Sequence, residues 1–296
     1  MFDLRYHVAS LAAVFVALVL GIFLGVGLSG KGFVSDAERE NLQAQIDALR
    51  AERDSAVARA AGADLRSGEL DSFAKTTYPG LVGGMLEGKR VGVVFVGSVD
   101  QGLAGTIRRS VADAGGRVTL TRALRVPLDA EATDSALRGE ADTRGLAGPD
   151  SRERLGRALA RELVAAGPNP VFDALTRVLV EEQSGSVNPA LDAVVVARPA
   201  APQQGETQTL LAGLYSGLAA APVPTVGVEK SDPKRSAIPV FHRRGLATVD
   251  SIDGAPGQVA LVFLLAGARP GSYGTGVDAT DGILPAPPPL PVTTKG

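Results

Sequence analysis

Residues 90–124 read RVGVVFVGSVDQGLAGTIRRSVADAGGRVTLTRAL, and this stretch determines the expected fold class. Its first eight residues are a continuous apolar run ending in glycine, which is typical of a strand buried on both faces of a parallel sheet. Residues 100–114 then repeat apolar side chains at helical spacing, and a Gly-Gly pair ends that helix. Residues 117–124 alternate as a second strand. The stretch therefore predicts a β-α-β unit, in which a helix joins two parallel strands.

The same alternation of strands and helices continues toward the C-terminus. The patterns predict further strands at 191–197, 224–228 and 246–249, and helices at 151–166, 172–183, 207–221 and 257–267. Strands that alternate with helices predict an α/β fold: a Rossmann-like, doubly wound, mostly parallel sheet with helices on both faces. We expect this domain to span residues 88–284. A proline-rich tail at residues 285–296 follows it as a disordered end, with a spacer or a groove ligand as alternatives.

The loop after the first strand is the candidate ligand crevice, because a doubly wound sheet binds ligands beyond the carboxyl ends of its strands. This loop reads GSVDQG and opens a helix whose N-terminus favours an anion. Gly97, Ser98 and Gly102 are the candidate crevice residues. The spacing is neither G-x-G-x-x-G nor a P-loop. The alternative is an ordinary turn in which Ser98 or Asp100 caps the helix.

The composition excludes several kinds of chemistry. Cysteine is absent, which excludes disulfides, thiolate metal sites and cysteine nucleophiles. The chain has two histidines and two methionines, His7, His242, Met1 and Met85, which are too few for a zinc site or a soft copper site. The net charge of −2 gives no basic footprint for nucleic acid. We expect no catalytic residue, no cofactor-binding residue, no metal ligand and no enzymatic activity.

Residues 35–63, which precede the domain, carry a heptad repeat of apolar side chains flanked by mixed charges. The centre of the apolar seam is Leu42, Ile46, Leu49 and Ala56. This pattern predicts a short coiled-coil helix, and a solvated amphipathic spacer is the alternative. Residues 64–87 are expected to be a connector to the α/β domain, with Tyr78-Pro79-Gly80 as a turn signal.

Residues 8–30 read VASLAAVFVALVLGIFLGVGLSG and contain no charged side chain. A bilayer core needs about 20 apolar residues as helix, so this stretch predicts a single-pass transmembrane anchor. A cleaved signal peptide is the alternative, but its apolar region runs only ~7–15 residues. Gly21 and Gly25 form a small-xxx-small pair that suits close helix packing or is ordinary glycine content. Nearby Lys and Arg do not orient the helix. The shortness of residues 1–7 favours a cytoplasmic lead and an extracytoplasmic domain.

Several stretches of the chain resemble the actinobacterial family of mycobacterial copper transport protein B (MctB), to which the cell-division protein SteB also belongs. They are LRYHVASL at residues 4–11, AVF at 13–15, GIFLG at 21–25, VDSID at 249–253, GSYG at 271–274 and LP at 284–285. The resemblance implies an envelope protein anchored in the inner membrane with its domain outside. It also implies two functions. One is copper homeostasis, proposed as efflux through an outer-membrane channel; the other is a role beside the membrane protein SteA in steering a peptidoglycan hydrolase.

Three functional hypotheses follow, and copper enters them only through the family name. The first is a coiled-coil scaffold or regulator in the cell envelope, acting as a homo-oligomer or in a hetero-complex with a SteA-like membrane protein. The second is a direct part in copper efflux. The third is a small-ligand-binding or enzymatic α/β domain that uses the crevice at Gly97 and Ser98.

Overall fold

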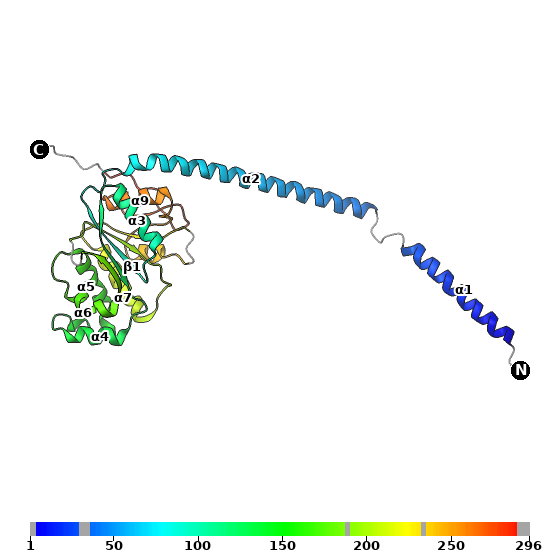
Figure 1. Ribbon diagram of the computed structural model, residues 1–296, viewed down its shortest axis with the longest axis horizontal. Helices are drawn as coiled ribbons and strands as arrows, with labels where there is room; N and C mark the ends of the chain where they lie inside the picture. Colours follow the sequence, from blue (N-terminus) through cyan, green and yellow to red (C-terminus); the bar gives the residue numbers. More distant parts are fainter. Residues whose placement is uncertain (1–3, 30–35, 187–189, 232–234, 289–296) are drawn as a thin grey trace. The chain divides into compact units, whose positions relative to one another are not determined.

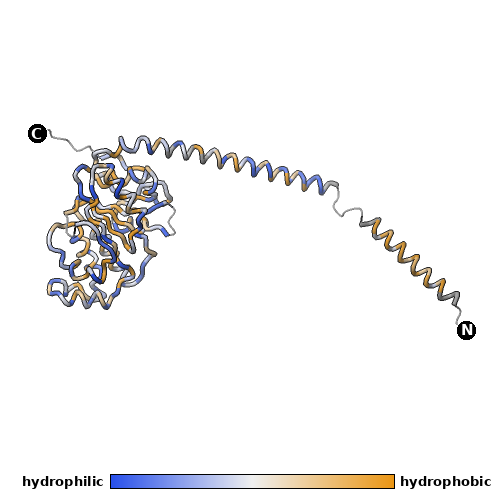
Figure 2. Tube along the Cα trace, in the orientation of Figure 1, coloured by the Kyte–Doolittle hydropathy of each residue, from blue (hydrophilic) through white to orange (hydrophobic). Residues whose placement is uncertain are grey.

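A computed structural model describes residues 4–29, 36–186, 190–231 and 235–288, and it separates into residues 1–68 and residues 69–296. Helix α1 spans Leu4–Ser29 and is predominantly apolar from Val8 onward (Figure 2). Its stretch Val8–Val26 is 19 residues long and has a mean hydropathy of 2.7. At ~1.5 Å rise per residue this stretch is about 28 Å long, which matches the hydrocarbon core of a bilayer. By length and composition, then, α1 is able to cross a membrane or to act as a signal sequence.

Helix α2 spans Asp36–Val82, so it is longer than the expected coiled-coil segment. The prediction of a turn at Tyr78-Pro79-Gly80 is wrong, because Pro79 lies inside this helix. Its carbonyl accepts a hydrogen bond from the backbone N–H of Gly83. The last turns of α2 are fixed by burial. Tyr78 and Val82 lie in the hydrophobic core of the second unit together with Leu86, whose backbone N–H donates to the carbonyl of Ala114. Burial in that core therefore maintains helix where the local sequence favours a turn.

Residues 90–273 form a seven-stranded sheet of order β3-β2-β1-β4-β5-β6-β7. All neighbours are parallel except β2 and β3, which are antiparallel. The strands are β1 Arg90–Val96, β2 Arg117–Leu124, β3 Val180–Gly185, β4 Ala193–Ala197, β5 Thr225–Val228, β6 Ala247–Val249 and β7 Ser272–Tyr273. The order reverses between β1 and β4, as in a doubly wound fold. The predicted α/β architecture is confirmed.

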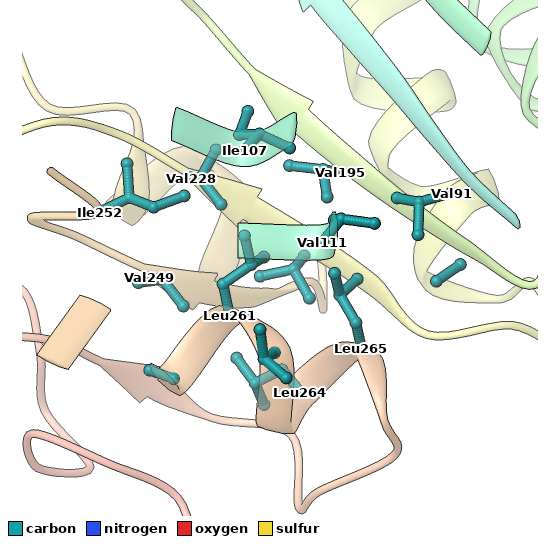
Figure 3. Packing of buried hydrophobic residues seen from close by; sticks show 14 of the residues in the cluster. Val91, Ile107, Val111, Val195, Val228, Val249, Ile252, Leu261, Leu264 and Leu265 are labelled. Carbon is teal, nitrogen blue, oxygen red and sulfur yellow. The ribbon is translucent and has the colours of Figure 1, made fainter. Parts of the chain in front are cut away.

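Helices cover both faces of the sheet (Figure 1). On one face α3 and α9 pack against the strands; Val111 of α3 lies close to Leu261 and Leu265 of α9 (Figure 3). On the other face the core comes from α4, α5, α6, α7 and α8. The helix bounds are α3 Gln101–Asp113, α4 Ala130–Gly139, α5 Arg152–Val164, α6 Pro170–Leu179, α7 Gly205–Ala219, α8 Ile238–Arg243 and α9 Ala255–Leu265, with short 3₁₀ turns at Arg144–Leu146 and Pro149–Ser151.

The helix expected at residues 172–183 ends four residues early, because residues 180–185 pair with the edge of β2 as strand β3. Arg122 of β2 holds this strand: its Nε donates to Oε1 of Gln183 at 2.7 Å, and its guanidinium lies 3.8 Å from the ring centroid of Phe172. Burial lowers the pKa of Arg122 to about 10. Sheet pairing has overridden the helical preference of the local sequence.

Helices α5 and α7 approach so closely that glycine is required on both. A Cβ on Gly213 would collide with the backbone of Glu153, and one on Gly156 with the backbone of Leu210. We expect Gly213→Ala to destabilise the domain by about 1–3 kcal/mol, since neither backbone yields without separating the helices. The control is Gly105→Ala on α3, where the nearest atom is the flexible end of Arg109 at 3.8 Å. Thermal unfolding of the two variants should show a loss of stability for Gly213→Ala alone; equal stabilities would contradict this packing.

Of the proline-rich tail, residues 289–296 lie outside the described part of the chain, as do residues 30–35 between the two N-terminal helices.

Candidate functional site

The expected crevice lies where the order of the strands reverses, at the carboxyl ends of β1 and β4. Gly97 follows β1 with φ +95°, and a Cβ there would lie 2.7 Å from the Cβ of Ala200. Ala200 belongs to the loop after β4, and its backbone N–H donates to the carbonyl of Val96 at 3.2 Å. The loop after β4 therefore packs directly on the end of β1, where a ligand of a doubly wound sheet would enter.

Asp100 occupies the N-terminus of α3, where the sequence predicts an anion site. Its carboxylate accepts from the backbone N–H of Leu103 at 2.9 Å and from Nζ of Lys230 at 2.7 and 2.8 Å. Burial by itself would raise the pKa of Asp100, but the hydrogen bonds from Lys230 and Leu103 outweigh it and hold that pKa below its usual value. The chain thus supplies its own anion to this helix N-terminus.

The other two crevice candidates also make internal contacts. The hydroxyl of Ser98 donates to Oε1 of Glu181 on β3 at 2.9 Å. A Cβ on Gly102 would lie 3.2 Å from Nζ of Lys230, so glycine leaves room for the Asp100–Lys230 ion pair. Nearby, Glu229 accepts from Ser236 and from the backbone N–H of Ala237, just before α8. These groups are used by the fold itself, in a cap, an ion pair and hydrogen bonds between loops.

The residues that could ligate copper through nitrogen or sulfur are dispersed. His242 is exposed on α8, whereas Met85 packs partly buried against the core beside α2. Met1 and the side chain of His7 lie outside what the structure describes. Within the described residues, no three His, Cys, Asp or Glu side chains gather in the way that a metal ion requires. The described residues therefore do not gather the soft nitrogen and sulfur ligands that copper prefers.

The arginines of α5 have two different environments, which the sequence does not separate. Arg152 is fully buried; its Nη1 and Nε donate to Asp134 and Glu206, both at 2.7 Å. Burial alone would raise the pKa of Asp134, but the hydrogen bond from Arg152 dominates and the pKa is lowered. The other arginines of this helix border an apolar hollow of about 850 Å³ between α5 and the end of α7; they are Arg154, Arg157 and Arg161. The buried network was missed because nothing local in the sequence links positions 134, 152 and 206.

The predicted apolar seam of α2 is exposed in the N-terminal unit. Leu42, Ile46 and Leu49 are 52%, 42% and 65% exposed, and Ala56 is exposed as well. Gly21 and Gly25 lie one turn apart on α1. A row of exposed Leu and Ile side chains at heptad spacing is what a coiled-coil helix presents to a partner.

Comparison with known proteins accounts for nearly the whole chain. Residues 1–284 match the family described as "Copper transport outer membrane protein, MctB". The chain belongs to the MctB family. It is 27% identical over 320 residues to the "Copper transporter MctB" of Mycobacterium tuberculosis (strain ATCC 25618 / H37Rv), covering 93% of this chain and 97% of that protein. The same identity and coverage hold for the "Copper transporter MctB" of Mycobacterium bovis (strain ATCC BAA-935 / AF2122/97).

The C-terminal stretches that suggested the MctB family have a structural role here. The carboxylate of Asp250, buried after β6, accepts from the backbone N–H groups of Thr275 and Gly276 at 2.9 and 3.0 Å. Gly274 has φ +138°, and a Cβ there would collide with this carboxylate. Asp253 accepts from the backbone and hydroxyl of Ser231. The VDSID and GSYG stretches therefore join the loops that follow β5, β6 and β7.

Proposed function

We propose that this chain is a membrane-tethered component of copper homeostasis that works through contacts with other proteins and is not an enzyme. The observation that carries the proposal is the family match, which extends through α1 and α2 as well as the α/β domain. The matched M. tuberculosis and M. bovis proteins bear the name copper transporter. In this proposal α1 is an uncleaved anchor, α2 is the contact helix and the domain lies outside the cytoplasm.

Copper is the cargo of the proposed pathway, and the described residues support an indirect handling of it. His242 and Met85 lie apart in the fold, and the carboxylates that surround the strand ends are engaged with Lys230, Ser231 and backbone N–H groups. A single apolar helix encloses no path for an ion by itself. A partner protein would therefore supply the copper ligands or the conduit, and this chain would position or regulate that partner.

Copper tolerance tests this function. A strain that lacks the gene should grow less well than its parent when copper is added, and the full-length chain should restore growth. We expect His242→Ala combined with Met85→Leu to restore growth equally, because neither side chain is part of a copper site in this proposal. Unaltered copper tolerance in the deletion strain would overturn the proposal. A failure of the double variant alone, at normal protein level, would indicate direct copper handling.

A second candidate function is a SteB-like scaffold in the cell envelope, in which α2 pairs with a second copy or with a SteA-like membrane protein and controls a peptidoglycan hydrolase. The exposed seam at Leu42, Ile46 and Leu49 favours this candidate. The deletion strain distinguishes the two functions: misplaced septa with normal copper tolerance support the scaffold, and copper sensitivity with normal septa supports copper homeostasis.

A further inference from the structure

The apolar hollow of about 850 Å³ beside α5 has no part in the strand-end crevice described above. It lies at the amino-terminal end of the sheet, because Leu191, two residues before β4, and Val223, two residues before β5, both line it. Leu146 and Val164 add further aliphatic wall, and Ala220, directly after α7, also lines it. A hollow of this size and lining is suited to receive apolar groups.

The hollow has a positively charged border. Three arginines of α5 form it: Arg154, Arg157 and Arg161. The row runs for ~10 Å, since seven helical residues separate its ends. Arg157 is paired with the half-exposed Glu153, whereas Arg154 donates to the uncharged oxygens of Ser151 and Gly145. No described residue that lines the hollow carries a carboxylate. The hollow therefore favours an apolar group that has negative charge beside it.

The loop after β7 presents a surface of this kind. Val277 is 99% exposed, and Ile283 is 55% exposed. Residues 271–288 contain two aspartates, Asp278 and Asp281, and neither lysine nor arginine. Asp281 is exposed and Asp278 is half-buried. The loop is thus apolar and acidic, where the border of the hollow is basic.

Hydrogen bonds hold the loop in this form. The hydroxyl of Ser272 donates to the carbonyl of Asp278 at 2.7 Å, and the backbone N–H of Gly274 donates to the carbonyl of Gly282 at 3.1 Å. Both bonds close the chain around Val277. A side chain on a closed loop loses little conformational freedom when it binds, so the loop is prepared for contact.

We propose that this loop of one copy of the chain inserts Val277 into the arginine-bordered hollow of a second copy. Val277 and Ile283 then meet the aliphatic wall, and the two aspartates face the arginines of α5. The hollow lies at the amino-terminal end of the sheet, while the loop follows the carboxyl end of β7. The contact is therefore heterologous and joins successive copies head to tail in a row.

The interface is small, so we expect the contact to be weak in dilute solution and to form where copies are concentrated. In the proposed function α1 confines the copies to one membrane, and chains reconstituted in phosphatidylcholine vesicles reproduce this condition. The contact itself does not depend on copper. It is also separate from any pairing through α2, because it uses the α/β domain alone.

Disulfide crosslinking tests the contact, because the chain has no cysteine of its own. One version carries Val277→Cys, and a second version with a different tag carries Ala220→Cys, an exposed position that lines the hollow. The two are reconstituted together and oxidised. We expect a disulfide between the two tags. The control pairs Val277→Cys with Ala112→Cys, an exposed position on α3, and should give a yield about five-fold lower or less. Equal yields for the two pairs would overturn the proposal, as would linkage of Val277→Cys chains to one another in place of linkage to Ala220→Cys.

Charge reversal tests the role of the arginines in the same crosslinking experiment. Arg154→Glu with Arg161→Glu in the Ala220→Cys chain should lower the yield by about five-fold, since both side chains are exposed and the aspartates would then meet carboxylates. The matched control is Arg108→Glu with Arg109→Glu, two exposed arginines of α3, which should leave the yield unchanged. Salt at about 1 M should also lower the yield of the unmodified pair, because it screens the charges of the interface. Equal yields from the two double variants would overturn the assignment of the hollow.

Discussion

Arg152→Ala is expected to destabilise the α/β domain by about 3 kcal/mol, because it leaves the largely buried carboxylate of Asp134 with only the exposed Arg138, 3.7 Å away, as its counter-ion. Arg152 is 0% exposed and is bonded to Asp134, whose side chain is 14% exposed, and to Glu206. Asp134 also accepts the backbone N–H of Gly148, so the network joins α4, the 3₁₀ turns, α5 and α7. Urea denaturation of the detergent-solubilised chain measures the loss in free energy of unfolding. The near-ultraviolet circular dichroism of the buried tyrosines reports the unfolding of the domain.

The control for this prediction lies on the same helix. Arg157 makes an ion pair with Glu153 at 2.8 Å, but both side chains are nearly half exposed. Arg157→Ala should change the free energy of unfolding by no more than about 0.5 kcal/mol. Similar losses for the two variants would mean that the buried network does not stabilise the fold as its geometry indicates.

Replacing Leu42, Ile46 and Leu49 together by aspartate is expected to abolish association of the chain through α2. Each apolar side chain contributes about 1.5–3 kcal/mol when it becomes buried at an interface, and the new carboxylates would repel one another. Three such losses in each helix weaken association by more than about a thousand-fold. Crosslinking in native membranes measures the change, with the full-length chain as the reference.

The matched control places the same three charges on the opposite side of the helix. Ala44, Ala51 and Ala58 are exposed, and each lies at the outer position of its heptad. The triple aspartate variant at these positions should crosslink as the unmodified chain does. If both triple variants associate normally, α2 is a solvated spacer and not a contact helix.

The strands of the α/β domain were predictable where a residue's neighbours along the chain determine its environment. The run at residues 90–96 is buried on both faces and reads as a parallel strand without further information. Strand β3 was not predictable, because Glu181, Glu182 and Gln183 favour a helix until the edge of β2 offers its hydrogen bonds. The helical course through Pro79 was missed for a similar reason, since burial of Tyr78 and Val82 in the distant core maintains it.

The candidate sites were likewise predictable only where neighbours along the chain determine them. The sequence places Gly97, Ser98 and Gly102 at a strand end, but it does not show that Ala200, Glu181 and Lys230 contact them there. Contacts between residues 80 to 130 positions apart follow from the order of the strands, which periodicity does not specify.

Copper(I) titration of the full-length chain tests most directly whether this MctB-family protein acts through contact and not through chelation. In this experiment the purified chain, kept in detergent under reducing conditions, competes for copper(I) with a weak copper(I) chelator. The account predicts that the chelator keeps all the copper, since the described side chains gather no soft ligand set. Retention of one copper ion per chain, lost on replacement of His242 or Met85, would contradict it.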